Sequence, residues 1–235
     1  MNISLKNKRA LVGGSSGGIG KAIAQQLAAS GASVTLMSHS EEKLKRIIDA
    51  LPKDQEQQHQ YLVVDFNDFH GFRKIISDYF KHNSVDILVN NTQGPVAGNA
   101  LEKKVSDYQE AFDLLFKTVV FTTELALKHM IENNWGRIIN VASISVKEPL
   151  SYLALSNSIR AAVVTWAKSL ATDVGKYNIT VNNVLTGYFD TDRIAQLNAK
   201  KAEQLGIEQS AVRKEMESKV AVKRIGDPKE YGYLT

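Results

Sequence analysis

The chain of 235 residues contains no cysteine. Disulfide frameworks, thiolate metal sites and cysteine nucleophiles are therefore excluded. The five histidines show no spacing typical of a metal site, so we expect no metal ion. Proline is scarce, with four residues, and we find no linker, repeat or low-complexity tract. The sequence therefore predicts a single domain that spans residues 1–235.

Long apolar runs are also absent. No segment is long enough to cross a bilayer, and residues 1–9 lead into the first expected strand without the apolar core of a signal peptide. The net charge is +4, but basic and acidic residues are mixed, as in residues 41–46. These features predict a cytoplasmic protein that binds neither membranes nor nucleic acids.

Short apolar segments alternate along the chain with segments of helical periodicity. Strands are predicted at residues 9–12, 33–37, 60–65, 87–90, 136–142 and 180–185. Helices are predicted at residues 21–30, 41–50, 69–82, 106–133 and 152–177. Short strands separated by helices are typical of a doubly wound α/β fold with a parallel sheet and helices on both faces.

A glycine-rich stretch at residues 13–20 follows the first expected strand and opens the first expected helix. Such a turn presents free N–H groups and the positive end of the helix dipole to an anion. Gly14 allows a tight turn, Gly18 allows a phosphate to approach the backbone, and Gly20 allows the helix to pack on the strand. The pattern predicts a dinucleotide site that includes Gly14, Ser16, Gly18, Ile19 and Gly20.

The end of the second expected strand bears on the choice of cofactor. An acidic residue there would bind the ribose 2′-hydroxyl of NAD(H) and repel a 2′-phosphate. This chain has Ser38 and His39 instead, with Lys43 nearby, so we expect NADP(H) to be preferred over NAD(H). An exposed loop histidine is the alternative interpretation of His39.

Further motifs follow in order. They are Asn-Asn-Thr-Gln-Gly at residues 90–94, an expected strand that ends at Ser143, and residues 182–187 followed by Thr191. With the glycine-rich loop, they make nearly the whole chain resemble the short-chain dehydrogenase/reductase family, which is built on a Rossmann fold. The resemblance implies that Ser143 is catalytic. It also implies that the cofactor contacts Asp65, Phe66, Asn91, Gly187 and Thr191.

The chain departs from the family pattern at its other catalytic positions. Counting from Ser143, the family's tyrosine and lysine fall on Ser156 and Arg160, and its helical asparagine falls on Leu115. A serine hydroxyl is a far poorer acid than a phenol, and an arginine stays protonated. Ser143 and Ser156 are therefore candidates to bind a carbonyl oxygen together, with Arg160 as the anchor of the nicotinamide ribose. The alternative is that Ser156 and Arg160 only cap and charge a cofactor-binding helix.

Part of the chain resembles a divergent branch of this family, which is commonly named by similarity to 3-oxoacyl-(acyl carrier protein) reductases. Asn-Asn-Thr-Gln-Gly-Pro at residues 90–95 and Ser-Asn-Ser-Ile-Arg at residues 156–160 carry this resemblance, and Thr-Asp-Arg at residues 191–193 agrees with it. It implies an NAD(P)(H)-dependent oxidoreductase acting on a small carbonyl or secondary alcohol. A nucleotide-binding or sensing protein without turnover, or an enzyme of altered chemistry such as a dehydratase, are the alternatives.

Three expectations concern the periphery. Apolar residues spread widely around the helix predicted at residues 106–133, which indicates either deep burial or a subunit contact. The resemblance implies a homodimer or homotetramer in which this helix and the helix at residues 152–177 form the subunit contact.

The polar segment 191–220 is either a lid over the substrate or a solvated pair of helices. The chain ends at Thr235, so we expect it to lack the family's final edge strand.

Overall fold

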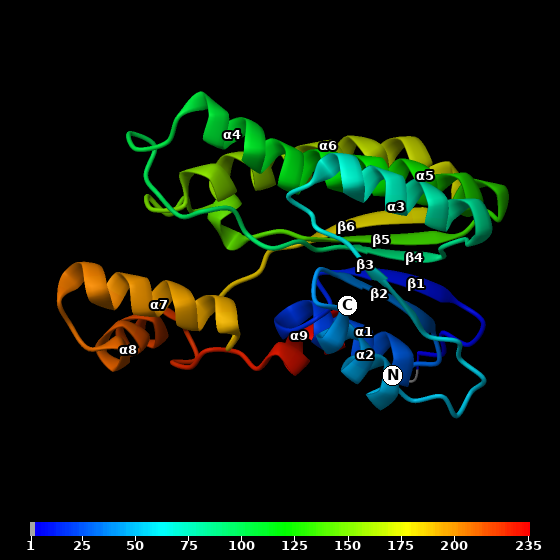
Figure 1. The fold of residues 1–235 in the computed structure, drawn as a ribbon, viewed down its shortest axis with the longest axis horizontal. Helices are drawn as coiled ribbons and strands as arrows, with labels where there is room; N and C mark the ends of the chain where they lie inside the picture. Colours follow the sequence, from blue (N-terminus) through cyan, green and yellow to red (C-terminus); the bar gives the residue numbers. More distant parts are fainter. Residues whose placement is uncertain (1–2) are drawn as a thin grey trace.

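A parallel sheet forms the centre of the computed structural model, which describes residues 3–235 (Figure 1). Within these residues the strands are β1 (Arg9–Gly13), β2 (Ser33–Ser38), β3 (Gln60–Val63), β4 (Ile87–Asn90), β5 (Gly136–Val141) and β6 (Ile179–Val184). Their order across the sheet is β3-β2-β1-β4-β5-β6. The chain crosses from one half of the sheet to the other between β3 and β4, next to β1, which creates a crevice at the carboxyl ends of the strands. This order confirms the predicted doubly wound α/β fold.

Helices cover both faces of the sheet (Figure 1). One face carries α3 (Phe69–His82), α5 (Thr118–Glu132) and α6 (Ala154–Val174), and the other carries α1 (Gly18–Ala29), α2 (Glu41–Ala50) and α9 (Pro228–Leu234). Each face has its own apolar cluster. Neighbouring strand residues point to opposite faces, so Leu11 belongs to one cluster and Val12 to the other. Burial on both faces explains why the central strands β1 and β4 have nearly continuous apolar runs.

The helix predicted at residues 106–133 is interrupted. The structure has α4 (Val105–Phe112), a π-helical turn at Asp113–Lys117, and then α5. The Thr118 hydroxyl donates a hydrogen bond to the carbonyl of Leu114 at 2.6 Å, and the Thr122 hydroxyl bonds the carbonyl of Thr118 at 2.8 Å. The apolar periodicity could not predict the interruption, because a π-turn adds one residue to a turn without ending the helix.

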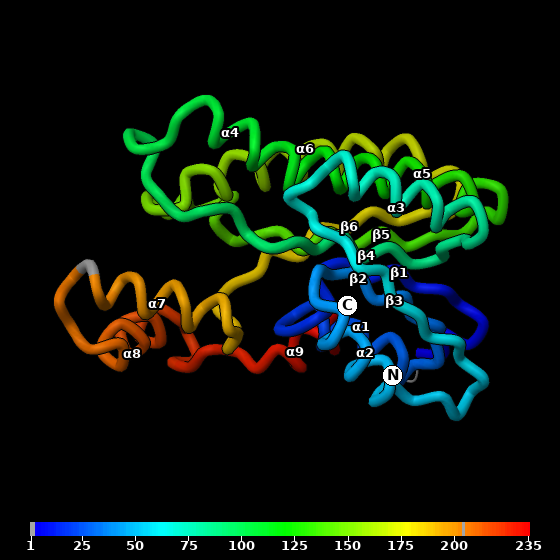
Figure 2. Tube along the Cα trace, in the orientation of Figure 1, coloured from blue at the N-terminus to red at the C-terminus, as the bar shows by residue number. Residues whose placement is uncertain are grey.

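The segment predicted as polar and helical at residues 191–220 forms α7 (Asp192–Leu205) and α8 (Gln209–Lys219). These two helices stand apart from the layers that cover the sheet (Figures 1 and 2). Surface ion pairs join them to each other and to the chain before them, from Lys201 to Glu215 at 2.8 Å and from Arg213 to Asp190 at 3.0 Å. The chain then returns to the sheet layers through α9, which packs on α1.

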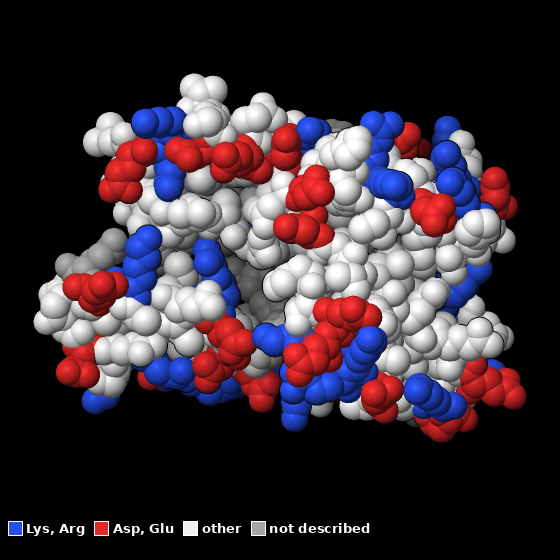
Figure 3. Space-filling view, in the orientation of Figure 1, with Lys and Arg blue, Asp and Glu red and all other residues white. Residues whose placement is uncertain are grey.

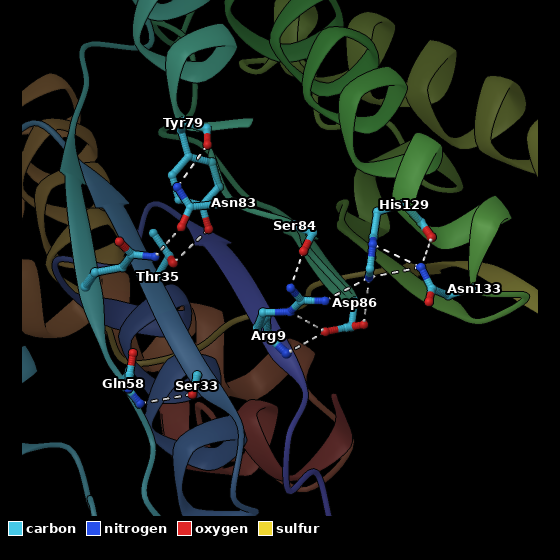
Figure 4. A network of polar contacts seen from close by, with 11 residues as sticks. Arg9, Ser33, Thr35, Gln58, Tyr79, Asn83, Ser84, Asp86, His129 and Asn133 are labelled. Atoms are coloured by element: carbon cyan, nitrogen blue, oxygen red, sulfur yellow. Dashed lines mark hydrogen bonds and ion pairs between the residues drawn. The ribbon is translucent and has the colours of Figure 1, made fainter. Parts of the chain in front are cut away.

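A polar network closes the end of the sheet where β1 and β4 begin (Figure 4). Asp86 accepts hydrogen bonds from the backbone nitrogen of Arg9 at 2.8 Å and from its Nε at 3.1 Å, and His129 lies 3.3 Å from its other oxygen. Burial raises the pKa of Asp86, but the bonds from Arg9 outweigh it, so the pKa lies below the ordinary value. The network therefore ties β1, β4 and α5 together.

In residues 3–235 no helix combines the length and apolar content needed to cross a bilayer.

Candidate active site

The carboxyl ends of the strands open into a cleft of about 610 Å³. The glycine-rich loop, the ends of β2, β4 and β5, the start of α6 and residues 186–197 line it. Figure 3 shows the surface hollowed between the α7–α8 pair and the body of the molecule. Ligands of open α/β sheets bind at this position, so we take the cleft as the candidate active site.

The glycine-rich loop is held rigidly at one end of the cleft. Gly14 has a φ of +56°, which favours glycine, and a Cβ on Gly20 would overlap the carbonyl oxygen of Gly14. Ser15 Oγ accepts a hydrogen bond from the backbone nitrogen of Met37 at 2.8 Å, and Asn91 Nδ2 donates to the carbonyl of Gly13 at 3.0 Å. The buried Ser15 thus fixes the loop to β2, a role that the glycine spacing does not reveal.

The amino terminus of α1 has the character of an anion site. Gly17 is its N-cap and provides no side-chain hydrogen bond, and the first turn contains no acidic residue. A Cβ on Gly17 would meet no atom within 4 Å, so the loop is open toward the cleft there. Uncapped N–H groups and the helix dipole together favour a phosphate group. The loop therefore fits the pyrophosphate of a dinucleotide.

At the end of the cleft beyond β2 lie Ser38, His39 and Lys43, and no acidic side chain lines this end in the described residues. The Ser38 hydroxyl donates to Ser16 Oγ at 2.7 Å. Phe66 also lines the cleft. Asp65 does not: it is exposed, and its Oδ1 accepts hydrogen bonds from the backbone and side-chain nitrogens of Asn67 at 2.9 and 3.0 Å. The cleft geometry thus gives no support to the prediction that Asp65 binds the cofactor.

Ser143, Ser156 and Arg160 line the opposite end of the cleft. Ser143 Oγ accepts a hydrogen bond from the backbone nitrogen of Ser145 at 3.1 Å. Ser156 Oγ accepts one from Arg160 Nε at 3.3 Å, and Arg160 Nη1 donates to the carbonyl of Val141 at 2.6 Å. Both serine oxygens are therefore oriented by donors of the protein, and among the described residues neither hydroxyl donates to a protein acceptor.

Arg160 lies in an unusual electrostatic environment. Burial, opposed by Tyr231 and reinforced by the positive charge of Arg193, lowers the pKa of its guanidinium to about 10. Burial raises the pKa of Tyr231 to about 12, and its hydroxyl accepts a hydrogen bond from Thr186 at 2.9 Å. At neutral pH, Arg160 is thus a cation and Tyr231 a neutral phenol behind the cleft wall.

Leu115 stands where the resemblance places an asparagine. With Asn90, Asn140 and Arg160, it lines a small cavity of about 10 Å³ that adjoins the cleft. Asn90 Nδ2 donates to Asn140 Oδ1 at 2.8 Å, and Asn140 Nδ2 donates to Asn183 Oδ1 at 3.0 Å. The side-chain amides of Asn90, Asn140 and Asn183 therefore form a hydrogen-bonded row across β4, β5 and β6. The helical position where the resemblance implies an asparagine is occupied by Leu115.

The other predicted residues also line the cleft. These are Ser16, Gly18, Ile19, Asn91, Gly187 and Thr191. The residues predicted from sequence did not include several others that line the cleft, namely the loop at residues 92–95, Leu153, Phe189 and the first turns of α7, including Arg193 and Gln196. The Thr-Asp-Arg motif at residues 191–193 pointed to this region, but only the tertiary structure places Arg193 Nη2 at 3.0 Å from the carbonyl oxygen of Pro95.

Comparison with known proteins agrees with this geometry. A family model described as short chain dehydrogenase matches residues 8–202. The 3-oxoacyl-[acyl-carrier-protein] reductase FabG of Chlamydia pneumoniae is 32% identical over 200 residues, which are 84% of this chain and 80% of that protein. The protein of the same name from Rickettsia conorii is 33% identical over 201 residues, or 86% of this chain and 80% of the relative.

Solved structures share the fold closely. L-sorbose reductase from Gluconobacter frateurii, complexed with NADPH and L-sorbose, superimposes with a TM-score of 0.90 and 26% identity. The match covers 100% of this chain and 90% of the reductase. YwfH, an NADPH-dependent reductase involved in bacilysin biosynthesis, gives a TM-score of 0.88 and 25% identity over 97% of this chain and 89% of its own.

Proposed function

The chain belongs to the short-chain dehydrogenase/reductase family, and on that basis we propose that it is an NADP(H)-linked oxidoreductase that interconverts a carbonyl and a secondary alcohol by using Ser143, Ser156 and Arg160. The 3-oxoacyl group named in its relatives is one candidate substrate. The observation that carries the proposal is the pair of serine hydroxyls at one end of the cleft. Each accepts a hydrogen bond from a nitrogen of the protein, Ser143 from the backbone of Ser145 and Ser156 from Arg160 Nε.

The two serines provide the oxygen-binding part of the site. Because Ser143 Oγ accepts from Ser145 N–H and Ser156 Oγ accepts from Arg160 Nε, both hydroxyl hydrogens are free to be donated into the cleft. Two donors at a carbonyl oxygen stabilise the negative charge that develops there when a hydride reaches the carbon. When bound, the nicotinamide supplies or accepts that hydride.

Arg160 positions and polarises Ser156. Its bond to the carbonyl of Val141 fixes the guanidinium, and its positive charge behind the Ser156 oxygen makes the hydroxyl a stronger donor. The arginine does not titrate at neutral pH, because its pKa of about 10 keeps it protonated. The proton that completes alcohol formation therefore reaches the oxygen through Ser156 or a water beside it.

The preference for NADP(H) rests on the residues at the other end of the cleft. Ser38, His39 and Lys43 offer hydrogen-bond donors and one positive charge, which suit a 2′-phosphate better than a free hydroxyl. Calorimetric titration with NADPH and with NADH tests this preference. Tighter binding of NADH would overturn it.

The reaction itself is tested by following NADPH oxidation with a panel of ketones, oxo acids and 3-oxoacyl thioesters. Removing one oxyanion donor costs about 10²–10³ in kcat in well-studied enzymes, so we expect losses of this size for Ser143→Ala and Ser156→Ala. Ser158→Ala is the matched control, because Ser158 lies on the same helix but bonds the carbonyl of Ala154 at 3.0 Å and does not line the cleft. Tight cofactor binding without turnover of any compound would instead favour a nucleotide sensor.

The double substitution Ser156→Tyr with Arg160→Lys distinguishes this mechanism from a conventional one. It restores the tyrosine and lysine that the family resemblance implies. We expect the native chain to be active and the double variant to gain little. Activity found in the double variant alone would contradict the proposed roles of Ser156 and Arg160.

We also propose that the protein forms a homodimer or homotetramer through α4, α5 and α6. Support comes from partly exposed aromatic side chains on this face, where Phe112 and Phe116 stack with ring centroids 4.9 Å apart and Trp166 lies edge-on to Phe116 at 6.0 Å. Light scattering at micromolar concentration tests the proposal, and a monomer would overturn it.

A further inference from the structure

Two arginines share the reactive end of the cleft without a carboxylate between them. Arg160 projects from α6 and uses Nε and Nη1 for Ser156 and the carbonyl of Val141. Arg193 lies in the first turn of α7 and donates one hydrogen bond, from Nη2 to the carbonyl of Pro95. In residues 3–235, no Asp or Glu oxygen lies within 4.0 Å of either guanidinium. Several donors of the pair are therefore left for a ligand.

Other arginines of the described chain are compensated. Arg9, Arg46, Arg213 and Arg224 form ion pairs with carboxylates at 3.1, 3.3, 3.0 and 2.6 Å. Arg73 and Arg137 lie over aromatic rings, at 5.9 and 4.5 Å from the ring centroids. Burial lowers the pKa of both the Arg160 and the Arg193 guanidinium, and the positive charge of Arg193 adds to the lowering at Arg160. An uncompensated pair of this kind favours an anion between the two groups.

The other charged groups around the cleft do not neutralise the pair. Lys43 and His39 lie at the far end, beyond β2. Asp192 is the one acidic side chain among the residues described as lining the cleft. It occupies the first turn of α7, where the positive end of the helix dipole stabilises a carboxylate. The phosphate groups of a dinucleotide have their own site at the amino terminus of α1, so the arginine pair is available to the substrate.

We propose that the substrate carries a carboxylate, so that it is a small oxo acid or hydroxy acid, and that Arg193 binds this group with Arg160 at its side. A guanidinium matches a carboxylate through two parallel hydrogen bonds, whereas a neutral ketone or thioester leaves these donors unpaired. Arg193 also connects two segments that border the cleft, because its Nη2 is bound to Pro95 while its backbone belongs to α7. This inference rests on the proposed function, since it assigns a substrate class to the same site.

The test compares Arg193→Met with the native protein and with the charge-conserving control Arg193→Lys. NADPH oxidation is measured with a series of 2-oxo and 3-oxo acids and with their methyl esters as neutral partners. A charged hydrogen bond contributes about 10- to 100-fold, so Arg193→Met is expected to lower kcat/KM for the acids by that factor. The values for the esters are expected to change by less than about twofold, and Arg193→Lys is expected to recover part of the loss for the acids.

Two binding measurements separate failure of this inference from failure of the proposed function. Calorimetry with NADPH alone is expected to give the same affinity for native protein and Arg193→Met. A loss of NADPH affinity with an unchanged ratio of acid to ester rates would assign Arg193 to the cofactor pyrophosphate and overturn the inference. Oxamate, an unreactive analogue of an oxo acid, is then titrated into the NADPH complex.

If oxamate or the oxo acids bind the native complex but not Arg193→Met, the carboxylate site stands even where no compound is reduced, and only the proposed reaction fails. If neutral ketones or 3-oxoacyl thioesters are reduced while no carboxylate binds or reacts, the reaction stands and the carboxylate site is overturned. Equal rates for acids and esters in the native protein would likewise overturn it.

Discussion

The two ends of the cleft are built by different means. The phosphate end is made of backbone: glycines at residues 14, 18 and 20, the uncapped start of α1, and clamps from Ser15 and Asn91. The reactive end is made of side chains from the segment after β5, from α6 and from α7, which are far apart in the sequence. A backbone site tolerates almost no substitution at its glycines, whereas a side-chain site keeps its shape while its chemistry changes. Under the proposed function, this difference allows the reactive end to vary while the cofactor end stays recognisable.

The largest effect is expected from Gly20→Ala at the phosphate end. Its Cβ would overlap the backbone oxygen of Gly14, and neither atom is on a flexible side chain, so the loop must shift. We expect NADPH affinity to fall by about a hundredfold or more and stability to fall by about 1–3 kcal/mol. Calorimetry and denaturant unfolding measure the two quantities.

Gly17→Ala is the matched control in the same loop. Gly17 has an extended backbone with φ of −177°, and a Cβ there would meet no atom within 4 Å. Its stability is therefore expected to match that of the native protein within about 0.5 kcal/mol. If Gly20→Ala bound NADPH as tightly as the native chain, the phosphate end would not depend on its backbone geometry.

At the reactive end, Arg160→Met is expected to lower kcat by about 10²–10³ while NADPH still binds. Arg160→Lys should recover part of the activity, since it keeps the positive charge. Because the protonated guanidinium is the active form and its pKa is about 10, the native rate should stay constant through neutral pH and fall as the pH rises through about 10. Rates measured with circular dichroism at each pH distinguish this titration from unfolding. A rate that rises across this interval would contradict the assigned role.

Lys43→Glu probes the far end of the cleft with a smaller expected effect. The substitution replaces a positive charge beside Ser38 and His39 with an acid, which repels a 2′-phosphate. Since charge pairs near the surface contribute about 1 kcal/mol or less, we expect NADPH to bind up to about fivefold more weakly and NADH to be affected little. An unchanged ratio of the two affinities would remove Lys43 from the cofactor site.

Asp86 lies at the opposite end of the sheet, so the substitution Asp86→Asn should leave the cleft unaffected. Losing the bonds from Arg9 is expected to lower the free energy of unfolding by about 1–3 kcal/mol at pH 7, with unchanged NADPH affinity. The folded pKa of Asp86 lies below its unfolded value, so its contribution is present above about pH 4 and is lost as the pH falls further. The stability difference between variant and native protein should therefore shrink in acid. A difference that grows below pH 4 would contradict this assignment.

The sheet was predictable because its signals are local. Short apolar strands, the spacing of the glycines and the turn into α1 each lie within a few neighbouring residues, and the predicted strands agree with the structure within two residues at each end. The serines and Arg160 could be located by counting from Ser143. The orientation of their hydroxyl groups could not, since it depends on the backbone nitrogen of Ser145 and on the guanidinium of Arg160.

The sequence by itself determined the doubly wound fold and the glycine-rich turn between the first strand and the first helix, because periodicity and motif spacing are properties of the chain alone. The tertiary structure decided which charges face each other. Arg193 lines the same cleft as Arg160 because the first turn of α7 lies beside the loop at residues 92–95. Asp65 is outside the cleft lining, and its carboxylate is bonded to Asn67. Contacts between distant segments are set by the packing of whole elements, and no local pattern of residues encodes them.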